Sequence, residues 1–470
     1  MITYSFTEKG SDPLYEHLYK CIKNDILQGT LKSGEKLPSK RSFAKNLDIS
    51  VITVENAYSQ LAAEGYIYSL PKKGFYVSDI KKPSVSGTDM FPAQTCLRDL
   101  PAPEYLADFT SNAVPSEQFP FSVWSKLLRE VLNDSQEELL TKSPGTGSLS
   151  LRRSIAGYIK DFRGMNVDPE RIVIGAGTEY MYGMIVRLLG HDRCYGIEDP
   201  GYQKTAMVYA INDAKCAHVP LDDDGISITS LEQQGVDVAH ISPSHHFPTG
   251  IITPVSKRYE LLGWAAKDSG RYIIEDDYDS EFRMTGKPLP TLMSIDTSEK
   301  VIYMNTFSKS LSAAMRVSYM VLPAHLAELY REKMFFYSCP VNDLIQIALS
   351  RFIDDGGFER HINRMRQFYK KQRDLLISEI KFSKMSKYVS VSEADSGLHF
   401  ILNLNIGCSD EDFRKRLLRR GIKISALSEY YAIPENRTEH RFVINYSSLT
   451  GKQIHDAVTA MGDEVIYAQM

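Results

Sequence analysis

Long apolar runs, paired cysteines and an excess of one charge are all missing from this chain of 470 residues. No apolar run is long enough to span a membrane, and the first residues have no apolar signal-peptide core. The six cysteines are scattered without a C-x-x-C pair, which argues against a zinc site and against a disulfide framework. We therefore expect a cytoplasmic protein in a reducing compartment, with no metal ion and no membrane partner.

The net charge of −4 argues neither for nor against nucleic acid as a partner, because a small basic module can be hidden in a neutral total. Hydrophobic residues make up 43% of the chain and charged residues 24%, which is typical of a globular protein. At this length we expect two or three domains rather than one.

The first eighty residues carry the pattern of three short helices and a hairpin. Asp12-Pro13 indicates the start of a helix in which apolar residues recur at every fourth position. Ser39 and Ser50 are each suited to cap a further helix, and a hairpin is predicted over residues 67–77. Three helices followed by a basic hairpin predict a winged helix-turn-helix, whose third helix lies in the major groove of DNA.

Two groups of side chains in this region suit DNA. Outward residues of the third helix include Thr53 and Asn56, and asparagine can pair with an adenine edge while the threonine methyl suits thymine. Cations that would meet phosphates flank the second helix and occupy the hairpin: Lys40, Arg41, Lys72 and Lys73. On pattern alone, a small helical module for protein interaction is the alternative.

A change in composition separates this region from the rest of the chain. Residues 79–106 are rich in proline, serine and other polar residues and show no period, which predicts a flexible linker between residues 1–78 and 107–470. From residue 171 onward, short apolar runs alternate with helix-length segments. The predicted strands are 171–174, 194–197, 216–219, 238–241, 272–275, 301–304 and 317–321. Seven buried strands with intervening helices favour an α/β domain with a largely parallel sheet.

Polar motifs follow several of these strands, at the edge where such sheets bind ligands. Gly177-Thr178 precedes a predicted helix, whose free N–H groups suit a phosphate. Tyr202, after the second strand, suits stacking on an aromatic ring, and a place in the core or at the rim is the alternative for this residue in isolation. Asp276, in an acid-rich segment after the fifth strand, is suited either to a divalent cation or to a protonated ring nitrogen.

Lys309 follows the sixth strand between two hydroxyl side chains, Thr306 and Ser308, with Arg316 seven residues further on. A desolvated lysine amine condenses with an aldehyde, and hydroxyls beside a guanidinium suit a phosphate. Pyridoxal phosphate (PLP) carries both groups. A surface lysine in a polar loop is the alternative for this motif in isolation. A phosphate cradle, a stacking aromatic, an acid and a lysine on successive strands together favour PLP.

Two sets of motifs resemble known families. The segments L-P-S-K-R-S-F-A (37–44), N-A-Y-S-Q-L-A-A-E-G-Y (56–66) and K-K-G-F-Y-V (72–77) are similar to the GntR-family DNA-binding domain. Arg41, Thr53, Lys73 and Gly74 fall where that family touches DNA, and Ser39 completes the predicted set of DNA contacts. The motifs G-A-G-T, E-D-P-G-Y, S-H-x-F-P-T-G, I-I-E-D-D-Y-D-S-E-F and T-F-S-K-S-L resemble a fold-type-I aminotransferase domain. The combination resembles the MocR subfamily of transcription regulators.

The resemblance implies both an architecture and residue roles. A winged helix-turn-helix would precede a fold-type-I domain with a seven-stranded, mainly parallel sheet, and residues 107–158 and 339–470 would form its smaller α+β subdomain. Lys309 would form the Schiff base with PLP, Asp276 would bind the pyridine nitrogen, Tyr278 the ring hydroxyl, and Tyr202 would stack on the ring. The phosphate would be surrounded by Gly177, Thr178, Thr306, Ser308 and Arg316. The protein would be a head-to-tail, domain-swapped homodimer.

The chain departs from working aminotransferases at three positions. Phe247 replaces their usual asparagine, Ser448 replaces an arginine that binds the substrate carboxylate, and Lys204 replaces a second arginine. Serine cannot make a bidentate carboxylate contact, and lysine is only a point charge.

We therefore expect a PLP-dependent transcription regulator rather than an enzyme. PLP on Lys309 would control binding to a double-stranded operator and would itself be the signal, as in regulation of pyridoxine biosynthesis. The first alternative is an amino acid or amine effector of the GABA or D-alanine type, captured as an external aldimine with Lys204 as a contact. The second is an active aminotransferase.

Overall fold

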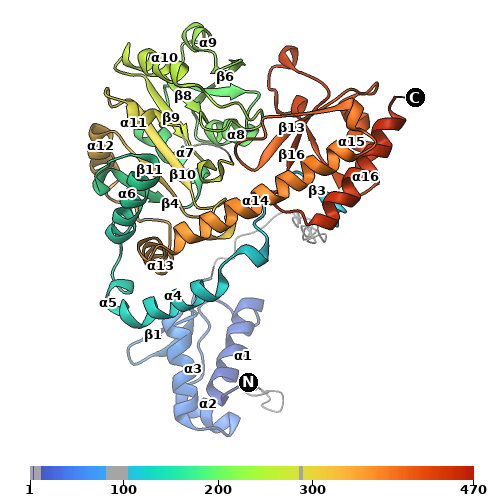
Figure 1. Ribbon diagram of the computed structural model, residues 1–470. Helices are drawn as coiled ribbons and strands as arrows, with labels where there is room; N and C mark the ends of the chain where they lie inside the picture. Colours follow the sequence, from blue (N-terminus) through green and yellow to red (C-terminus); the bar gives the residue numbers. More distant parts are fainter. Residues whose placement is uncertain (1–3, 5–11, 81–103, 285–288, 470) are drawn as a thin grey trace. The chain divides into compact units, whose positions relative to one another are not determined.

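The computed structural model describes residue 4 and residues 12–80, 104–284 and 289–469. The chain divides into two compact units, Met1–Pro101 and Ala102–Met470, which are coloured along the sequence in Figure 1. Most of the expected linker, residues 79–106, lies outside the described residues, so its extent stays a prediction. No helix in the described part of the chain is both long and apolar enough to cross a membrane.

The three helices and the hairpin predicted for the first unit are confirmed. The elements are α1 (Leu14–Gln28), α2 (Lys40–Leu47), α3 (Val51–Ala63), β1 (Ile67–Leu70) and β2 (Gly74–Val77). The Ser39 hydroxyl accepts a hydrogen bond from the Ser42 amide at 3.2 Å, and the Ser50 hydroxyl accepts one from the Thr53 amide at 3.1 Å. These caps satisfy N–H groups that the first helical turn leaves free, and so they set where α2 and α3 begin.

The core of the first unit is built from one face of each helix. On α3, four residues at helical spacing are fully buried: Val54, Ala57, Tyr58 and Leu61. They pack with Leu18 and Ile22 of α1 and with Phe43 of α2. Because each buried aliphatic side chain contributes about 1.5–3 kcal/mol, this small core suffices to hold α3 with its opposite face exposed.

The second unit is organised around an eight-stranded sheet. Its strand order is β4-β11-β10-β9-β8-β5-β6-β7. The strands are β4 (Ile172–Gly175), β5 (Cys194–Asp199), β6 (Lys215–Asp222), β7 (Gly225–Ile226), β8 (Val238–Ile241), β9 (Tyr272–Asp276), β10 (Val301–Thr306) and β11 (Ser318–Val321). Seven of them match the predicted strands, and the neighbours from β10 to β6 are parallel. The eighth, β7, is an antiparallel edge strand of two residues, which is too short to produce a sequence pattern.

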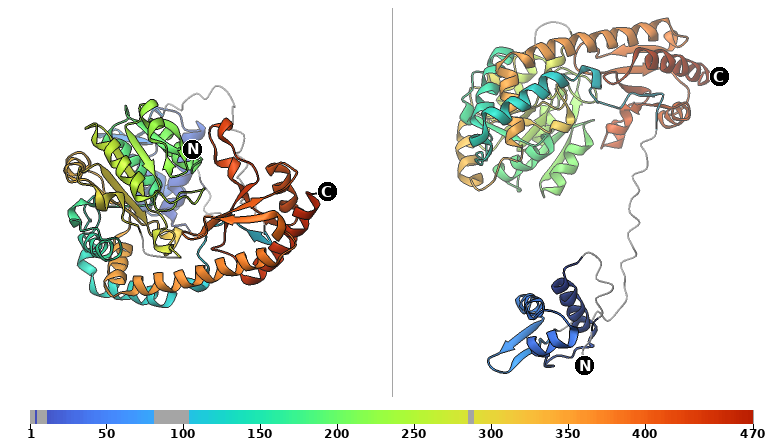
Figure 2. Two further views of the ribbon diagram at one scale, coloured as in Figure 1. Left: turned by 45° about the horizontal axis from the view of Figure 1, so that its top comes forward. Right: turned by 90° about the horizontal axis from the view of Figure 1, so that it is seen from below.

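Helices cover both faces of this sheet (Figures 1 and 2). Ile273 and Ile274 are adjacent in β9 but belong to different apolar clusters, because successive side chains of a strand point to opposite faces. Ile274 packs on the side of α7 (Thr178–Leu189) and α12 (Ala324–Met334). Ile273 packs on the side of α10 (Val255–Ala266). The shorter elements of this part are α8 (Gln203–Ile211), α9 (Ile228–Gln233) and α11 (Leu292–Ile295).

A smaller antiparallel sheet forms the other part of the second unit. Its order is β12 (Val389–Ser392), β13 (His399–Leu404), β16 (Arg441–Asn445) and β15 (Ser425–Ala426). Nearby, β3 (Ala107–Asp108) pairs in parallel with β14 (Ile422–Lys423). The helices are α15 (Asp410–Arg419), α16 (Gly451–Tyr467) and the long α14 (Gly357–Phe382), which runs from the large sheet to the small one (Figures 1 and 2). The 3-10 turns are η1 (Ser116–Gln118), η2 (Pro169–Arg171), η3 (Ser280–Phe282), η4 (Ala313–Met315), η5 (Ser386–Tyr388), η6 (Leu427–Tyr430) and η7 (Pro434–Asn436).

The assignment of residues 107–158 and 339–470 to the smaller subdomain is only partly right. Strand β3 joins it, but α4 (Phe121–Asp134), α5 (Gln136–Leu139) and α6 (Leu149–Arg163) do not. Helices α4 and α6 pack against α13 (Asp343–Asp354), and α6 also packs against β4. Helix α13 falls within residues 339–470, so its packing against α4 and α6 shows that part of this second range also lies outside the smaller subdomain.

Candidate functional site

A pocket of about 220 Å³ opens at the carboxyl ends of the central strands of the large sheet. Eight of the nine residues expected to bind PLP line it: Thr178, Tyr202, Asp276, Tyr278, Thr306, Ser308, Lys309 and Arg316. The ninth, Gly177, lies beside it as the N-cap of α7. The structure therefore brings together residues that are more than a hundred positions apart in the chain.

Lys309 lies in the turn after β10, where its amine is largely removed from water. Burial lowers the pKa of Lys309 to about 8, although the nearby carboxylate of Asp279 acts in the opposite direction. An amine with this pKa is partly neutral near pH 7, which is the form that attacks an aldehyde.

Asp276 ends β9, lines the pocket and has one carboxylate oxygen without a hydrogen-bond partner in the described part of the chain. Its Oδ2 accepts a hydrogen bond from the Tyr182 hydroxyl at 2.6 Å and lies 3.6 Å from His240 Nε2. The Tyr209 hydroxyl lies 2.7 Å from His240 Nδ1, which fixes that imidazole in turn. The other oxygen, Oδ1, is buried and has no hydrogen-bond partner among the described residues. A buried acceptor of this kind is suited to a protonated ring nitrogen.

Hydroxyls, a helix N-terminus and a guanidinium gather at the opposite end of the pocket. Thr306 Oγ1 donates to Ser308 Oγ at 2.9 Å, and Thr178 is the first residue of α7. The Arg316 guanidinium lies so close to Gly177 that a Cβ at this position would be 2.2 Å from Arg316 Nη2. Gly177 also has a φ of 93°, which side chains rarely adopt. These groups suit a phosphate, so the described residues fit PLP at both ends.

Lys204 does not line the pocket, although the sequence suggested it as an effector contact. Its amine forms an ion pair with one carboxylate oxygen of Glu179, whose other oxygen bonds to Arg316. Ser448 lies beyond the end of β16 and is also absent from the lining. Of the described residues that line the pocket, only Lys309 and Arg316 are lysine or arginine.

Aromatic rings and neutral side chains form another part of the pocket wall. The Phe247 ring meets Tyr202 edge-on at 5.9 Å, His399 at 5.2 Å and Tyr430 at 5.2 Å, measured between centroids. Asn112 also lines the pocket and accepts a hydrogen bond from the Asn445 side chain. Burial lowers the pKa of His399 well below its usual value, so this imidazole is neutral at physiological pH.

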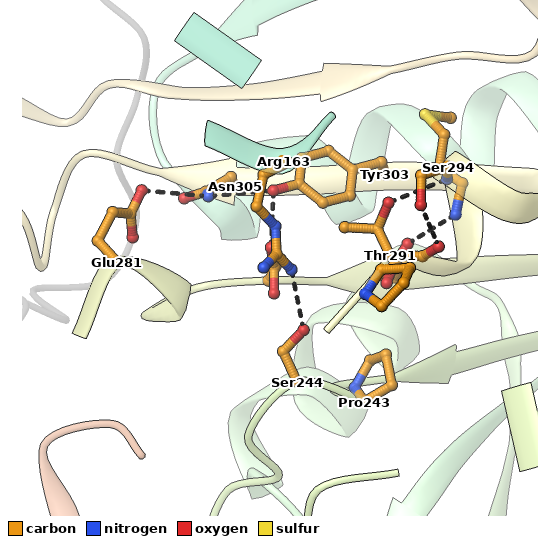
Figure 3. Close-up of polar contacts among 12 residues, drawn as sticks. Arg163, Pro243, Ser244, Glu281, Thr291, Ser294, Tyr303 and Asn305 are labelled. Atoms are coloured by element: carbon orange, nitrogen blue, oxygen red, sulfur yellow. Dashed lines mark hydrogen bonds and ion pairs between the residues drawn. The ribbon is translucent and has the colours of Figure 1, made fainter. Parts of the chain in front are cut away.

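The acid-rich segment after β9 is held by a buried polar network (Figure 3). Arg163 forms an ion pair with Asp277 at 2.7 Å and donates to the Ser244 hydroxyl at 3.1 Å. The Tyr303 hydroxyl donates to Asp277 at 2.7 Å, and the Asn305 amide donates to Glu281 at 3.4 Å. One oxygen of each carboxylate, Asp277 Oδ2 and Glu281 Oε1, is bonded in this way, so the network ties the acid-rich segment to α6 and β10 beside Asp276.

The adjacent histidines 245 and 246 point to different partners. His245 Nδ1 lies 2.9 Å from Asp279 Oδ2 and 3.3 Å from the Tyr278 hydroxyl. His246 lies 2.7 Å from the Thr249 hydroxyl through Nδ1, and burial lowers the pKa of His246 to about 3. No group of three or more metal-ligating side chains is found within the described ranges.

Several site residues were not anticipated from the sequence. Tyr182 follows Thr178 by four positions, so helical spacing alone would have placed both on one face of α7. His240 carried no such signal, because its contact with Asp276 depends on the pairing of β8 with β9. No role was predicted for Glu179, since its partners Lys204 and Arg316 lie 25 and 137 positions away.

The first unit presents most of its expected DNA contacts on the surface. The exposed ones are Ser39, Arg41, Asn56, Lys72 and Lys73. Gly74 begins β2 with a φ of 108°. Thr53 shares a hydrogen bond of 2.8 Å with the Ser50 hydroxyl, and Lys40 forms an ion pair of 2.6 Å with Glu55. Lys40 is thus held by a carboxylate, in contrast to the lysines of the hairpin.

Two family models match the chain. The model described as bacterial regulatory proteins, gntR family, matches residues 14–77, and that of aminotransferase class I and II matches residues 106–461. Together they cover both units.

Relatives with the same two parts match over most of their length. An uncharacterized HTH-type transcriptional regulator, YdeL of Bacillus subtilis, is 36% identical over 89% of this chain and 90% of its own. The probable rhizopine catabolism regulatory protein MocR of Rhizobium meliloti is 28% identical over 96% and 93%. The HTH-type pyridoxine biosynthesis transcriptional regulator PdxR of Corynebacterium glutamicum is 27% identical over 87% of both chains.

Solved structures share the fold of the second unit. A kynurenine aminotransferase of Pyrococcus horikoshii matches with a TM-score of 0.68 and 22% identity, covering 78% of this chain and 92% of that one. At this identity the likeness establishes the fold, a fold-type-I aminotransferase architecture, and nothing about substrate.

Proposed function

The chain belongs to the MocR subfamily of GntR-type transcription regulators, with a DNA-binding helix-turn-helix joined to a PLP-dependent, aminotransferase-like domain, and we propose that PLP itself is its signal. In this proposal the occupancy of the pocket by PLP sets the affinity of the protein for its operator. Bound PLP supplies an aldehyde that an amine can capture and a ring that can withdraw electrons.

Each side chain around the pocket has a role in this proposal. Lys309 holds PLP covalently, and Asp276 accepts the ring N–H through its free Oδ1. Tyr278 faces the ring hydroxyl, while Tyr202 stacks on the ring. The phosphate is held by Gly177, Thr178, Thr306, Ser308 and Arg316. In the first unit, Arg41, Lys72 and Lys73 contact phosphates, whereas Thr53 and Asn56 contact base edges, with Ser39, Lys40 and Gly74 at the edges of this surface.

The choice of PLP as the signal rests on one observation. The described lining of the pocket provides partners for each end of PLP but no lysine or arginine besides Lys309 and Arg316. A carboxylate effector needs a cation, and an arginine would recognise it best. The wall beside Lys309 instead offers Phe247, His399 and Asn112. A relative named as a regulator of pyridoxine biosynthesis supports the same choice.

The proposed assembly is a head-to-tail homodimer. Large apolar side chains on the second unit are exposed, as they are at many protein interfaces: Met207 (69%), Ile211 (82%), Phe335 (78%) and Phe336 (64%). A second copy of the chain is the partner that this proposal assigns to them.

The switch obeys a thermodynamic limit. PLP must bind more tightly to one arrangement of the DNA-binding units than to another, and the shift in operator affinity cannot exceed that difference. The test is a titration of PLP-stripped protein with PLP, in the absence of amino compounds, while operator affinity is measured for wild type and Lys309→Ala. Lys267→Ala, which removes an exposed lysine of the same unit, is the matched control.

We expect PLP alone to change the operator affinity of the wild type and of the control, and to act much more weakly on Lys309→Ala. If PLP binds but the operator affinity does not change, the proposal is contradicted. The effector would then be an amine that binds beside the cofactor. Sustained transamination with a named amino donor would instead favour an active aminotransferase.

A further inference from the structure

Glu179 sits between the two cations nearest the phosphate end of the pocket. It lies in the first turn of α7, two residues after Gly177. One carboxylate oxygen bonds to Arg316 Nη2, and the other bonds to Lys204 Nζ. The side chain is 30% exposed, so it is neither locked in the core nor free in solvent. A single carboxylate therefore ties together the guanidinium of the pocket and a lysine outside it.

A carboxylate and a phosphate make the same kind of contact with a guanidinium. Both accept charge-assisted hydrogen bonds from its N–H groups, and both carry negative charge. Arg316 Nη2 already bonds to Glu179 and lies 3.4 Å from the carbonyl oxygen of Ala176. A phosphate bound at Thr178, Thr306 and Ser308 would need this guanidinium and would also meet the negative charge of Glu179.

We propose that Glu179 is an internal competitor of the cofactor phosphate, whose carboxylate holds Arg316 and lowers the affinity for PLP. This inference rests on the proposed function, because a regulator that senses PLP must not be saturated at every PLP concentration. Lys204 has the opposite effect, since it neutralises part of the charge on Glu179. The pair thereby sets the concentration range in which the protein responds.

The decisive variant is Glu179→Gln, which keeps the shape of the side chain and removes its charge. PLP-stripped wild type and variant are titrated with PLP, and separately with pyridoxal, which lacks the phosphate. The absorbance of the covalent complex with Lys309 reports binding. We expect Glu179→Gln to bind PLP about tenfold more tightly, the size of one screened charge interaction, with pyridoxal affinity unchanged.

Glu170→Gln is the matched control, because Glu170 also pairs with an arginine, Arg152 at 3.2 Å, but this arginine, unlike Arg316, does not line the pocket. An unchanged or weaker affinity of Glu179→Gln for PLP overturns the inference. Equal tightening for pyridoxal overturns it as well, because the effect would then not act through the phosphate.

A second variant, whose expected effect on PLP affinity has the opposite sign, distinguishes this role of Glu179 from a folding defect. Lys204→Met should weaken PLP binding in the wild-type background and should have little effect when Glu179 is already glutamine. An equal effect in both backgrounds would mean that Lys204 acts on the phosphate directly.

If PLP controls operator affinity in every variant but the PLP concentration at the midpoint is unchanged, only the role of Glu179 fails. If PLP never changes operator affinity, the proposed function fails instead.

Discussion

In the first unit the expected DNA contacts Arg41, Asn56 and Lys73 are exposed to water, whereas in the second unit the groups around Lys309 and Asp276 are buried. Water screens the first group, so each cation there acts as a separate and modest charge. Burial makes the second group interdependent, because a buried polar atom depends on the partners that its neighbours provide. Substitutions should therefore have large effects in the second unit and smaller, nearly additive effects in the first.

The largest effect is expected for Asp276→Asn. An amide at this position cannot supply the negative charge that stabilises a protonated ring nitrogen, and it disturbs the bond from Tyr182. We expect PLP affinity to fall about a hundredfold, measured by equilibrium titration of the stripped protein. Asp224→Asn, an exposed aspartate of the same unit, should bind PLP as the wild type does. A change below threefold would mean that Asp276 does not contact the ring.

Gly177→Ala should weaken PLP binding by about tenfold to thirtyfold, because a Cβ at this φ displaces the Arg316 guanidinium. The affinity for pyridoxal should change less, since the loss lies at the phosphate end. Gly157→Ala is the control. Gly157 lies within α6, and a Cβ at this position would have no described atom within 4 Å beyond its chain neighbours and the backbone of its own helix. Equal losses for PLP and pyridoxal would place the damage elsewhere in the pocket.

The rate at which the protein captures PLP should rise about tenfold between pH 7 and pH 9. The pKa of Lys309 is lowered from 10.5 to about 8 by burial, so the neutral fraction of its amine increases over this interval. The folded protein releases this proton at lower pH than the unfolded chain does. The free energy of unfolding therefore rises with pH between about 8 and 10.5 relative to Lys309→Met.

Stopped-flow absorbance measures the capture rate, and an acetylated lysine amide serves as the reference amine. A rate that keeps climbing to pH 10 and beyond, as expected for a lysine with an ordinary pKa, would argue that Lys309 is not desolvated in solution.

Replacing Lys72 and Lys73 together by alanine should weaken operator binding about tenfold near physiological salt. The slope of log affinity against log salt should flatten by about 1.8, because two phosphate contacts are lost. Lys20→Ala, on α1 and paired with Asp12 at 2.7 Å, is the control. An unchanged slope would show that the hairpin does not touch phosphate.

The smallest effect is expected for Lys40→Ala. Its amine is held by Glu55 at 2.6 Å, so it adds less positive charge to the surface than a free lysine does. We expect the salt slope to flatten by less than about 0.5. A change as large as that caused by one hairpin lysine would mean that DNA displaces Glu55 from Lys40.

The sequence predicted local structure better than it predicted contacts. It placed Ser39 and Ser50 at the starts of α2 and α3, and it located β8 at residues 238–241 as observed. It also selected eight of the residues that line the pocket. It missed Tyr182 and His240, and it assigned α6 to the wrong part of the second unit. The misses of His240 and α6 concern which distant segments meet, and a pattern along the chain carries little information about that. Tyr182 is different, because its helical spacing from Thr178 was a local signal.

What the sequence by itself determined is what depends on near neighbours: the helical face of Val54 and Leu61, the caps, and the order of the polar motifs after the strands. These features follow from hydrogen bonds between residues close in the chain and from the burial of side chains that recur at the helical or strand period. Only the tertiary structure decided that β8 lies beside β9, which puts His240 next to Asp276, and that Glu179 bonds to both Lys204 and Arg316. These contacts arise from the packing of segments far apart in the chain, and that packing also buries Lys309 and lowers the pKa of its amine.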